Sequence, residues 1–328
     1  MDKRDLRAFL ILAVFFSALV AILGMAISSQ AAKSERVNRL LQTGACARCD
    51  LDGINLKNAD LEDANLQNVS LRNADLSGSD LGGVNFSDAV LSGTSLSEVN
   101  LSGANLTQAV LSGASLNKAK LNQADLRRAY IGDASLTKAV LNRASLDDAV
   151  LNRSDLQDAN LRDTDLRRVD FAESNLRGAD LRNSKLTRAN LVDTDLSYAN
   201  LKGADLRRAD LRRATLRSAN LRRTNLADTT LNDVDLSEVD LFKASLFRAY
   251  LRDANLSNSS LVQVDLRGAT LPRAVLRNAN LRGANLEGAN LRKADLTGAN
   301  LNGVDLTFTI LCNTTMPNGA VEDRDCDA

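Results

Sequence analysis

A period of five residues is the feature that most restricts how this chain can fold. Every fifth residue from Leu51 to Leu311 is Leu or another large apolar residue, and Met316 extends the phase once more, so 54 pentapeptides follow one another without an insertion. Three of them replace Leu: Phe86, Ile131 and Phe171. A period of five matches neither the 3.6-residue period of an α-helix nor the alternation of a long strand. The chain must therefore turn once in every repeat.

The residues around each Leu indicate how the turn is made. The residue two positions before Leu is small, usually Ala, and the residue directly before Leu is commonly Asn or Asp, as at Asn65 and Asp75. Gly often follows two positions after Leu, as at Gly78. Asn and Asp side chains bond local backbone groups in turns, and Gly adopts backbone angles that other residues avoid. We expect one short extended side and one tight turn per repeat, with four sides closing a square coil of about twenty residues.

The repeated run resembles a known family. Residues 199–206, Ala-Asn-Leu-Lys-Gly-Ala-Asp-Leu, are similar to the A(D/N)LXX repeat of pentapeptide-repeat proteins, and the resemblance covers about four-fifths of the chain. It implies an all-β solenoid, a right-handed quadrilateral β-helix with Leu and the small residue pointing inward. At a strand spacing of roughly 4.8 Å, about 13 coils would make a rod about 65 Å long over residues 51–316.

The N-terminal segment is apolar. Residues 8–27 contain no charged side chain, and twenty such residues are long enough to span a bilayer. Small residues near Ser29 and Ala31 also fit a signal-peptide cleavage site. We assign residues 1–32 to a transmembrane anchor or a signal peptide and favour the uncleaved anchor, which would contact the membrane through residues 8–27.

Both ends of the solenoid need caps, because terminal coils expose unpaired backbone and apolar side chains. Residues 33–50 are expected to form the N-terminal cap, with a short helix that begins at Ser34 and ends at Gly44. Its apolar face would carry Val37, Leu40 and Leu41. Residues 317–328 are expected to form the C-terminal cap or tail.

Four cysteines lie at the two ends of the predicted rod. Cys46 and Cys49 continue the repeat phase backwards and would point inward, whereas Cys312 and Cys326 lie at the other end. Two disulfides that staple the ends are the simplest interpretation, and reduced core cysteines or a redox-active CxxC remain alternatives. The end segments also resemble the caps of exported or thylakoid-lumen cyanobacterial pentapeptide-repeat proteins. That resemblance implies that the repeats lie outside the cytoplasm, in a periplasm or a thylakoid lumen.

Two groups of apolar residues occupy positions that should face outward. A candidate ladder over four coils consists of Val90, Val110, Tyr130 and Val150. A second cluster within one coil consists of Phe242, Phe247 and Tyr250. Such residues either stabilise the stacking of coils or bind a partner. Five Arg-Arg pairs, among them Arg167–Arg168, make the middle of the chain mildly basic, and we expect most of them to be ion-paired on the surface. The alternative is contact with an anionic group such as phosphate or a lipid headgroup.

Composition excludes several kinds of chemistry. The chain contains no His and no Trp, and only 3% of its residues are aromatic, which excludes Ser-His-Asp and Cys-His nucleophiles and HExxH zinc sites. We therefore expect no enzyme activity, no cofactor and no metal site.

The leading function is a membrane-tethered or exported scaffold rod with a protein partner that the sequence does not identify. The alternative, which the resemblance implies for some members, is imitation of DNA to bind a topoisomerase such as DNA gyrase. No direct nucleic-acid binding is expected, and the oligomeric state is not determined by the sequence.

Overall fold

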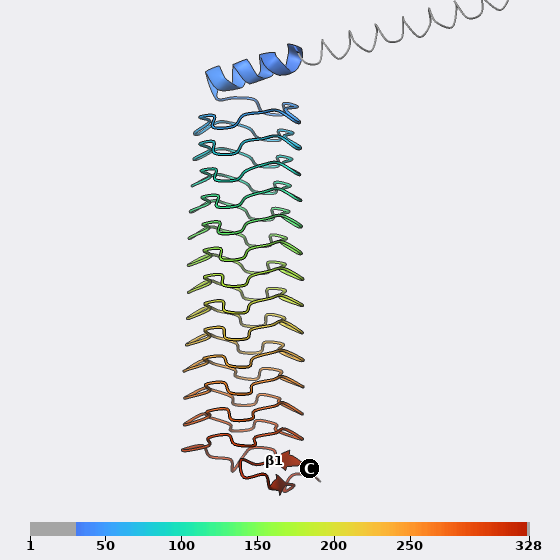
Figure 1. Cartoon of the computed structure of the whole chain (residues 1–328), viewed down its shortest axis with the longest axis vertical. Coiled ribbons are helices and arrows are strands. Elements are labelled where there is room, and N and C mark those ends of the chain that lie inside the picture. The colour runs from blue at the N-terminus through green and yellow to red at the C-terminus, as the bar shows by residue number, and fades with distance from the viewer. Residues whose placement is uncertain (1–30, 327–328) are drawn as a thin grey trace, which may run out of the picture.

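The computed structural model describes residues 31–326, which form a rod of stacked coils with a helix across the N-terminal end (Figure 1). The apolar segment 8–27, expected to be an anchor or signal, lies outside the described residues. Over residues 31–326, no helix combines the length and the apolar character that crossing a bilayer requires.

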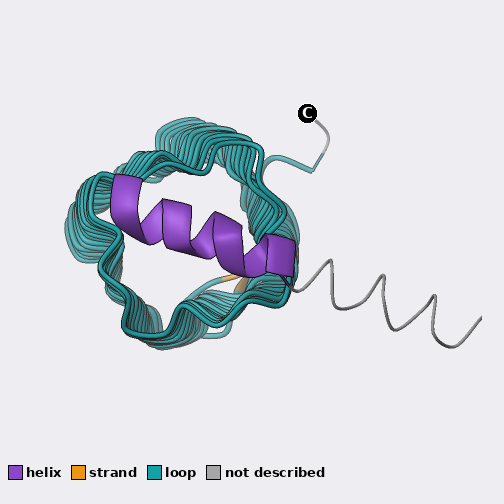
Figure 2. Ribbon diagram, turned by 90° about the horizontal axis from the view of Figure 1, so that it is seen from above, coloured by secondary structure: helices purple, strands orange, loops and turns teal. Residues whose placement is uncertain are grey.

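Viewed along the rod, the coils superpose as a quadrilateral (Figure 2). Parallel β-bridges join residues twenty apart, from Ala45–Asn65 to Asp295–Thr315, so one coil contains twenty residues as predicted. In residues 31–326 only two strands are longer than a single bridge: β1 (Thr314–Thr315) and β2 (Val321–Glu322), which pair antiparallel. Each side of a coil is thus held by a single bridge, because the chain turns again before a longer strand can form.

Backbone hydrogen bonds between coils follow one rule, which the repeat beginning at Leu61 illustrates. The N–H of Leu61 donates to the carbonyl oxygen of Asp80 at 2.8 Å, and the N–H of Asp63 donates to that of Gly82 at 2.8 Å. Both bonds point toward the C-terminal end of the rod. The N–H of Asn65 points the other way and donates to Gly44 O at 2.7 Å. Three of the five N–H groups in a repeat therefore hold neighbouring coils together.

The other two N–H groups are satisfied within the turn. The N–H of Ala64 donates to Leu61 O at 3.1 Å, which closes a four-residue turn. The N–H of Glu62 donates to Oδ1 of Asp60, the residue before Leu, at 3.3 Å. Asn or Asp is common before Leu because its side-chain oxygen is the acceptor for this otherwise unpaired N–H.

The third residue of each turn has a left-handed backbone. Its φ is positive at nearly every repeat, for example +55° at Asp63, +62° at Arg188 and +72° at Gly203. Glycine at this position was expected, yet most repeats place Asn, Asp, Arg or Lys there. A residue with a Cβ atom loses roughly 1–2 kcal/mol in this conformation. The turn and coil-to-coil hydrogen bonds of the same repeat offset that cost.

The core is a stack of the repeated Leu and small residues. The residue at the Leu position of every repeat from Leu51 to Leu296 is at most 4% exposed, which confirms that these side chains point inward. Ser and Thr replace Ala at several small positions without leaving their hydroxyls unpaired. Thr94 Oγ1, for example, donates to the carbonyl oxygen of Leu71 in the preceding coil at 2.7 Å.

The N-terminal cap differs in part from the expectation. Residues 31–43 are helical, so Ser34 lies inside the helix and does not begin it. Leu40 is fully buried against the first coil, but Leu41 is 52% exposed, because a helix lying across the end of the core presents only a narrow stripe to it. Gly44 ends the helix as expected: its φ is +64°, and its N–H donates to Leu40 O at 2.8 Å.

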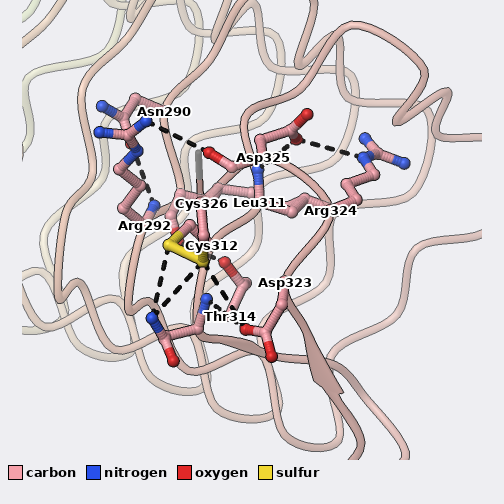
Figure 3. The surroundings of a disulfide bond; sticks show 11 residues. Asn290, Arg292, Leu311, Cys312, Thr314, Asp323, Arg324, Asp325 and Cys326 are labelled. Atoms are coloured by element: carbon pink, nitrogen blue, oxygen red, sulfur yellow. Dashed lines mark hydrogen bonds and ion pairs between the residues drawn. A yellow bond between two sulfur atoms is a disulfide. The ribbon is translucent and has the colours of Figure 1, made fainter. Parts of the chain in front are cut away.

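The C-terminal tail folds back over part of the last coil (Figure 3). A disulfide joins Cys312 to Cys326, as another joins Cys46 to Cys49 at the opposite end. Oδ2 of Asp325 accepts the N–H of Leu311 at 2.9 Å. The carboxylate thereby replaces a carbonyl oxygen of the coil that would come next.

Candidate interaction surface

The predicted apolar ladder lies along one side of the rod. Val90, Val110, Tyr130 and Val150 are joined in that order by parallel bridges. The three valines are half-buried, whereas Tyr130 is 41% exposed. We call these four residues the valine ladder. They form a continuous apolar strip across four coils.

The residues two positions after each member of the valine ladder are small or have short polar side chains. They are Ser92, Ser112, Gly132 and Asn152. A Cβ atom at Gly132 would lie 2.7 Å from Oδ1 of Asn152, so a larger residue there would require the Asn152 side chain to move. The Tyr130 ring lies against Gly132, which is buried.

The valine ladder lacks the usual turn acceptor. Val and Tyr cannot accept the hydrogen bond that Asn or Asp provides in other repeats. Within residues 31–326, the N–H groups two positions after each ladder residue have no protein acceptor. Each lost bond to a side-chain cap costs on the order of 1 kcal/mol. Stacking between the apolar side chains of the valine ladder stabilises the rod only by the amount that exceeds the cost of the lost hydrogen bonds.

The second apolar cluster is divided by the structure. Phe242 lies under the guanidinium of Arg222, 4.5 Å from the ring centroid. The guanidinium groups of Arg248 and Arg267 lie 6.0 and 5.6 Å from the centroid of the Phe247 ring. Both rings thus make cation–π contacts, although Phe247 remains 37% exposed.

Tyr250, by contrast, is 48% exposed, and its bridges to Thr230 and Thr270 place it on the same line of residues as the valine ladder, several coils further on. Of the second cluster, Tyr250 alone therefore extends the valine ladder's side of the rod.

The Arg pairs are largely ion-paired, as expected. Arg167 contacts Asp165, two residues earlier in the chain, at 2.7 Å, and Arg168 contacts Asp148 one coil earlier at 2.6 Å. The hydrogen bonds from Arg168 lower the pKa of Asp148, and those from Arg153 lower the pKa of Asp133. Charges of opposite sign thus lie next to one another over much of this surface, while residues 121–225 keep five more basic than acidic side chains.

These ion pairs predict sensitivity to acid. The folded pKa of Asp133 and Asp148 is below the unfolded value of about 3.9. The pairs therefore stabilise the rod above about pH 4, and their contribution is lost as the pH falls through the lowered folded values. We expect the melting temperature to fall between pH 5 and pH 2, and to fall less in an Arg153→Gln, Arg168→Gln variant. An equal fall in both proteins would contradict a role for these pairs.

Catalytic or metal-binding geometry is not found in the described part of the chain. No group of three or more Cys, Asp or Glu side chains in residues 31–326 could hold a metal ion. A hollow of about 380 Å³ is lined by Thr107, Gln108 and five charged residues, of which Arg168 pairs with Asp147 and Asp148. The valine ladder remains the feature that departs most clearly from the repeat rule.

Comparisons with known proteins agree on the kind of chain this is. The family model described as pentapeptide repeats matches in eight copies, over residues 49–88, 94–131, 134–171, 174–213, 209–246, 249–288 and 279–316. No curated protein sequence matched the chain.

Several solved structures are similar. HetL, a pentapeptide repeat protein involved in heterocyst differentiation regulation from Nostoc sp. strain PCC 7120, is 35% identical over 66% of this chain and 91% of its own, with a TM-score of 0.49. Rfr23 from Cyanothece 51142 is 30% identical over 40% and 88%, with a TM-score of 0.27. QnrB1, a plasmid-mediated fluoroquinolone resistance protein, is 15% identical over 56% and 92%, with a TM-score of 0.40.

The family fold is a right-handed quadrilateral β-helix with inward Leu and small residues, and the twenty-residue coils described above have this construction. The family model covers most of residues 49–316. The chain therefore belongs to the pentapeptide-repeat family.

Proposed function

We propose that this chain is an exported or membrane-tethered rod that binds a protein partner along the valine ladder. As a pentapeptide-repeat protein it is a structural or interaction protein and not an enzyme. The observation that carries the proposal is the valine ladder itself, where four successive coils exchange a stabilising turn acceptor for an apolar side chain. Continuous apolar strips on otherwise polar surfaces are typical of interaction sites.

The two disulfides support the extracytoplasmic part of the proposal. Such bonds persist in oxidising compartments and are rare in the cytosol. Both lie at ends of the rod: Cys312–Cys326 holds the tail against the last coil, and Cys46–Cys49 lies within a single repeat next to Arg39 of the helix. The apolar segment 8–27 would supply the tether or the export signal.

Topology and cysteine state test the location together. Intact cells that carry the protein and right-side-out vesicles would be treated with protease and with a membrane-impermeant thiol reagent, before and after reduction. We expect protease-accessible repeats whose four cysteines react only after reduction. Protected repeats with free thiols would place the rod in the cytoplasm, reject the export proposal and favour the topoisomerase alternative.

A triple substitution, Val90→Asn, Val110→Asn and Val150→Asn, tests the binding surface. Asn at these positions would restore the turn acceptor that Asn105 provides to Thr107 in a regular repeat, so the melting temperature should stay equal or rise. Loss of the apolar strip should reduce recovery of crosslinked partner at least tenfold.

The matched control is Val140→Asn, which makes the same change on a different side of the rod. Undiminished partner recovery with the triple variant would reject the valine ladder as the binding surface.

A further inference from the structure

The last coil is capped on one side only. Over residues 311–313, carboxylates of the tail stand in for the missing coil: Asp325 accepts the N–H of Leu311, and Asp323 accepts that of Asn313, both at 2.9 Å (Figure 3). Over residues 301–308 the described tail supplies no such acceptor; its contact there comes from Arg324, whose guanidinium donates to the carbonyl oxygen of Leu306. The C-terminal end of the rod therefore has a closed half and an open half. We call residues 301–308 the open half-coil.

The open half-coil presents unpaired backbone donors. One coil earlier, the N–H groups of Leu281 and Gly283 donate forward to the carbonyl oxygens of Asn300 and Asn302 at 2.9 and 3.0 Å. The equivalent N–H groups of the open half-coil have no acceptor within residues 31–326; they belong to Leu301, Gly303, Leu306 and Phe308. By the direction of the bonds in earlier coils, these donors face away from the rod. They form the edge on which another coil would be built.

Apolar side chains accompany this edge. Leu301 and Leu306 are only partly buried, whereas every repeat position from Leu51 to Leu296 is nearly inaccessible. Phe308 is 71% exposed, the highest exposure among the large apolar residues described. A hollow of about 480 Å³ lies beside Phe308. An exposed edge with apolar side chains is a template for adding a strand from another chain.

Charge and shape indicate what can occupy the edge. The N-terminal end of a second copy is closed by the helix of residues 31–43, so head-to-tail stacking is blocked (Figure 2). Tail-to-tail contact would oppose like charges, because residues 301–326 carry four acidic side chains and only one Arg. The acidic residues are Asp305, Glu322, Asp323 and Asp325. The end is instead complementary to a basic segment.

We propose that the open half-coil binds a segment of a partner protein that contains apolar and basic residues and turns with the edge, adding it as part of a further coil of the solenoid. Carbonyl oxygens of the segment accept the unpaired N–H groups of the edge. Its apolar residues cover Leu301, Leu306 and Phe308, and its basic residues lie near Asp305. This site is separate from the valine ladder and does not depend on the proposed compartment.

A labelled octapeptide, Val-Lys-Val-Asn-Gly-Val-Lys-Val, whose central Asn-Gly allows it to turn with the edge, is the probe, and fluorescence anisotropy with the full purified chain measures binding. Phe308→Ser should weaken binding about tenfold without lowering the melting temperature, because this side chain is largely exposed. Asp305→Asn keeps an oxygen that can accept the N–H of Thr307, as Asp305 Oδ1 does, but removes the charge. It should weaken binding about threefold and more so at low salt.

Two controls separate strand addition from charge attraction and from the valine ladder. A peptide of equal charge with Pro at one central Val cannot pair along its length and should bind at least tenfold more weakly. Tyr130→Ser should leave binding unchanged. Equal binding of the two peptides, or no effect of Phe308→Ser, would overturn the proposal. Light scattering that shows a dimer which Phe308→Ser dissociates would assign the edge to a second copy and would overturn it too.

Discussion

Leu186→Asp is expected to divide the rod into two segments that unfold separately. Leu186 is fully buried in a middle coil, and an aspartate there would place an unpaired charge among Leu side chains. The expected loss of stability is more than about 4 kcal/mol. A solenoid is coupled mainly through neighbouring repeats, so the damage should interrupt cooperativity at this coil. Calorimetry should show two transitions where the original chain shows one.

Arg188→Asp is the matched control, because it introduces the same carboxylate into the same turn on the outside of the coil. Arg188 is exposed and has a φ of +62°, a conformation that Asp adopts at the equivalent position of many repeats. Its effect should stay within about 0.5 kcal/mol. A single unshifted transition for Leu186→Asp would mean that this residue does not point inward.

Loss of the C-terminal disulfide is expected to have the second-largest effect. The Cys312→Ser, Cys326→Ser variant opens a loop of about fifteen residues, and chain entropy alone predicts a loss of about 3 kcal/mol. The tail would also release Asp323 and Asp325 from the backbone N–H groups that they cap. Hydrogen exchange should therefore increase in the last two coils and remain slow in the middle of the rod.

The Cys46→Ser, Cys49→Ser variant gives the comparison at the other end. That disulfide closes a loop of only a few residues, so its loss should cost roughly 1 kcal/mol less. The helix of residues 31–43 would still cover the core through Leu40. Equal destabilisation by the two double variants, or unchanged exchange near residue 311, would contradict the capping role assigned to the tail.

The repeat made most of the fold predictable from the sequence. A five-residue period forces one turn per repeat, and the alternation of Leu with a small residue identifies the inward positions, as at Leu206 and Ala204. The turn acceptors were also foreseeable, because Asn and Asp directly precede Leu. Left-handed Arg and Lys residues in the turns, such as Arg188, were not foreseeable, because their conformation is stabilised by bonds between coils and not by local preference.

The ends and the candidate sites were less predictable, because they depend on contacts that do not repeat. Leu41 has the spacing of a core residue, but the tilt of the helix across the first coil exposes it. Phe242 and Phe247 are neighbours in sequence with Tyr250, yet Arg side chains from adjacent coils contact the two phenylalanines and leave Tyr250 without such a contact among the described residues. The open half-coil follows the Leu period without interruption, and its exposure results from a tail that covers only one side of the last coil.

Because the twenty-residue coil is uninterrupted, the number of a surface residue determines its position on the rod. The remainder of its number on division by twenty names the side or corner of the rod, and the quotient gives its height in steps of roughly 4.8 Å. Two binding groups can thus be placed at a chosen separation by choosing two numbers. Outward positions accept charged, polar and apolar residues without altering the interior. Surface residues can therefore be substituted while the spacing between coils, which the core determines, stays the same.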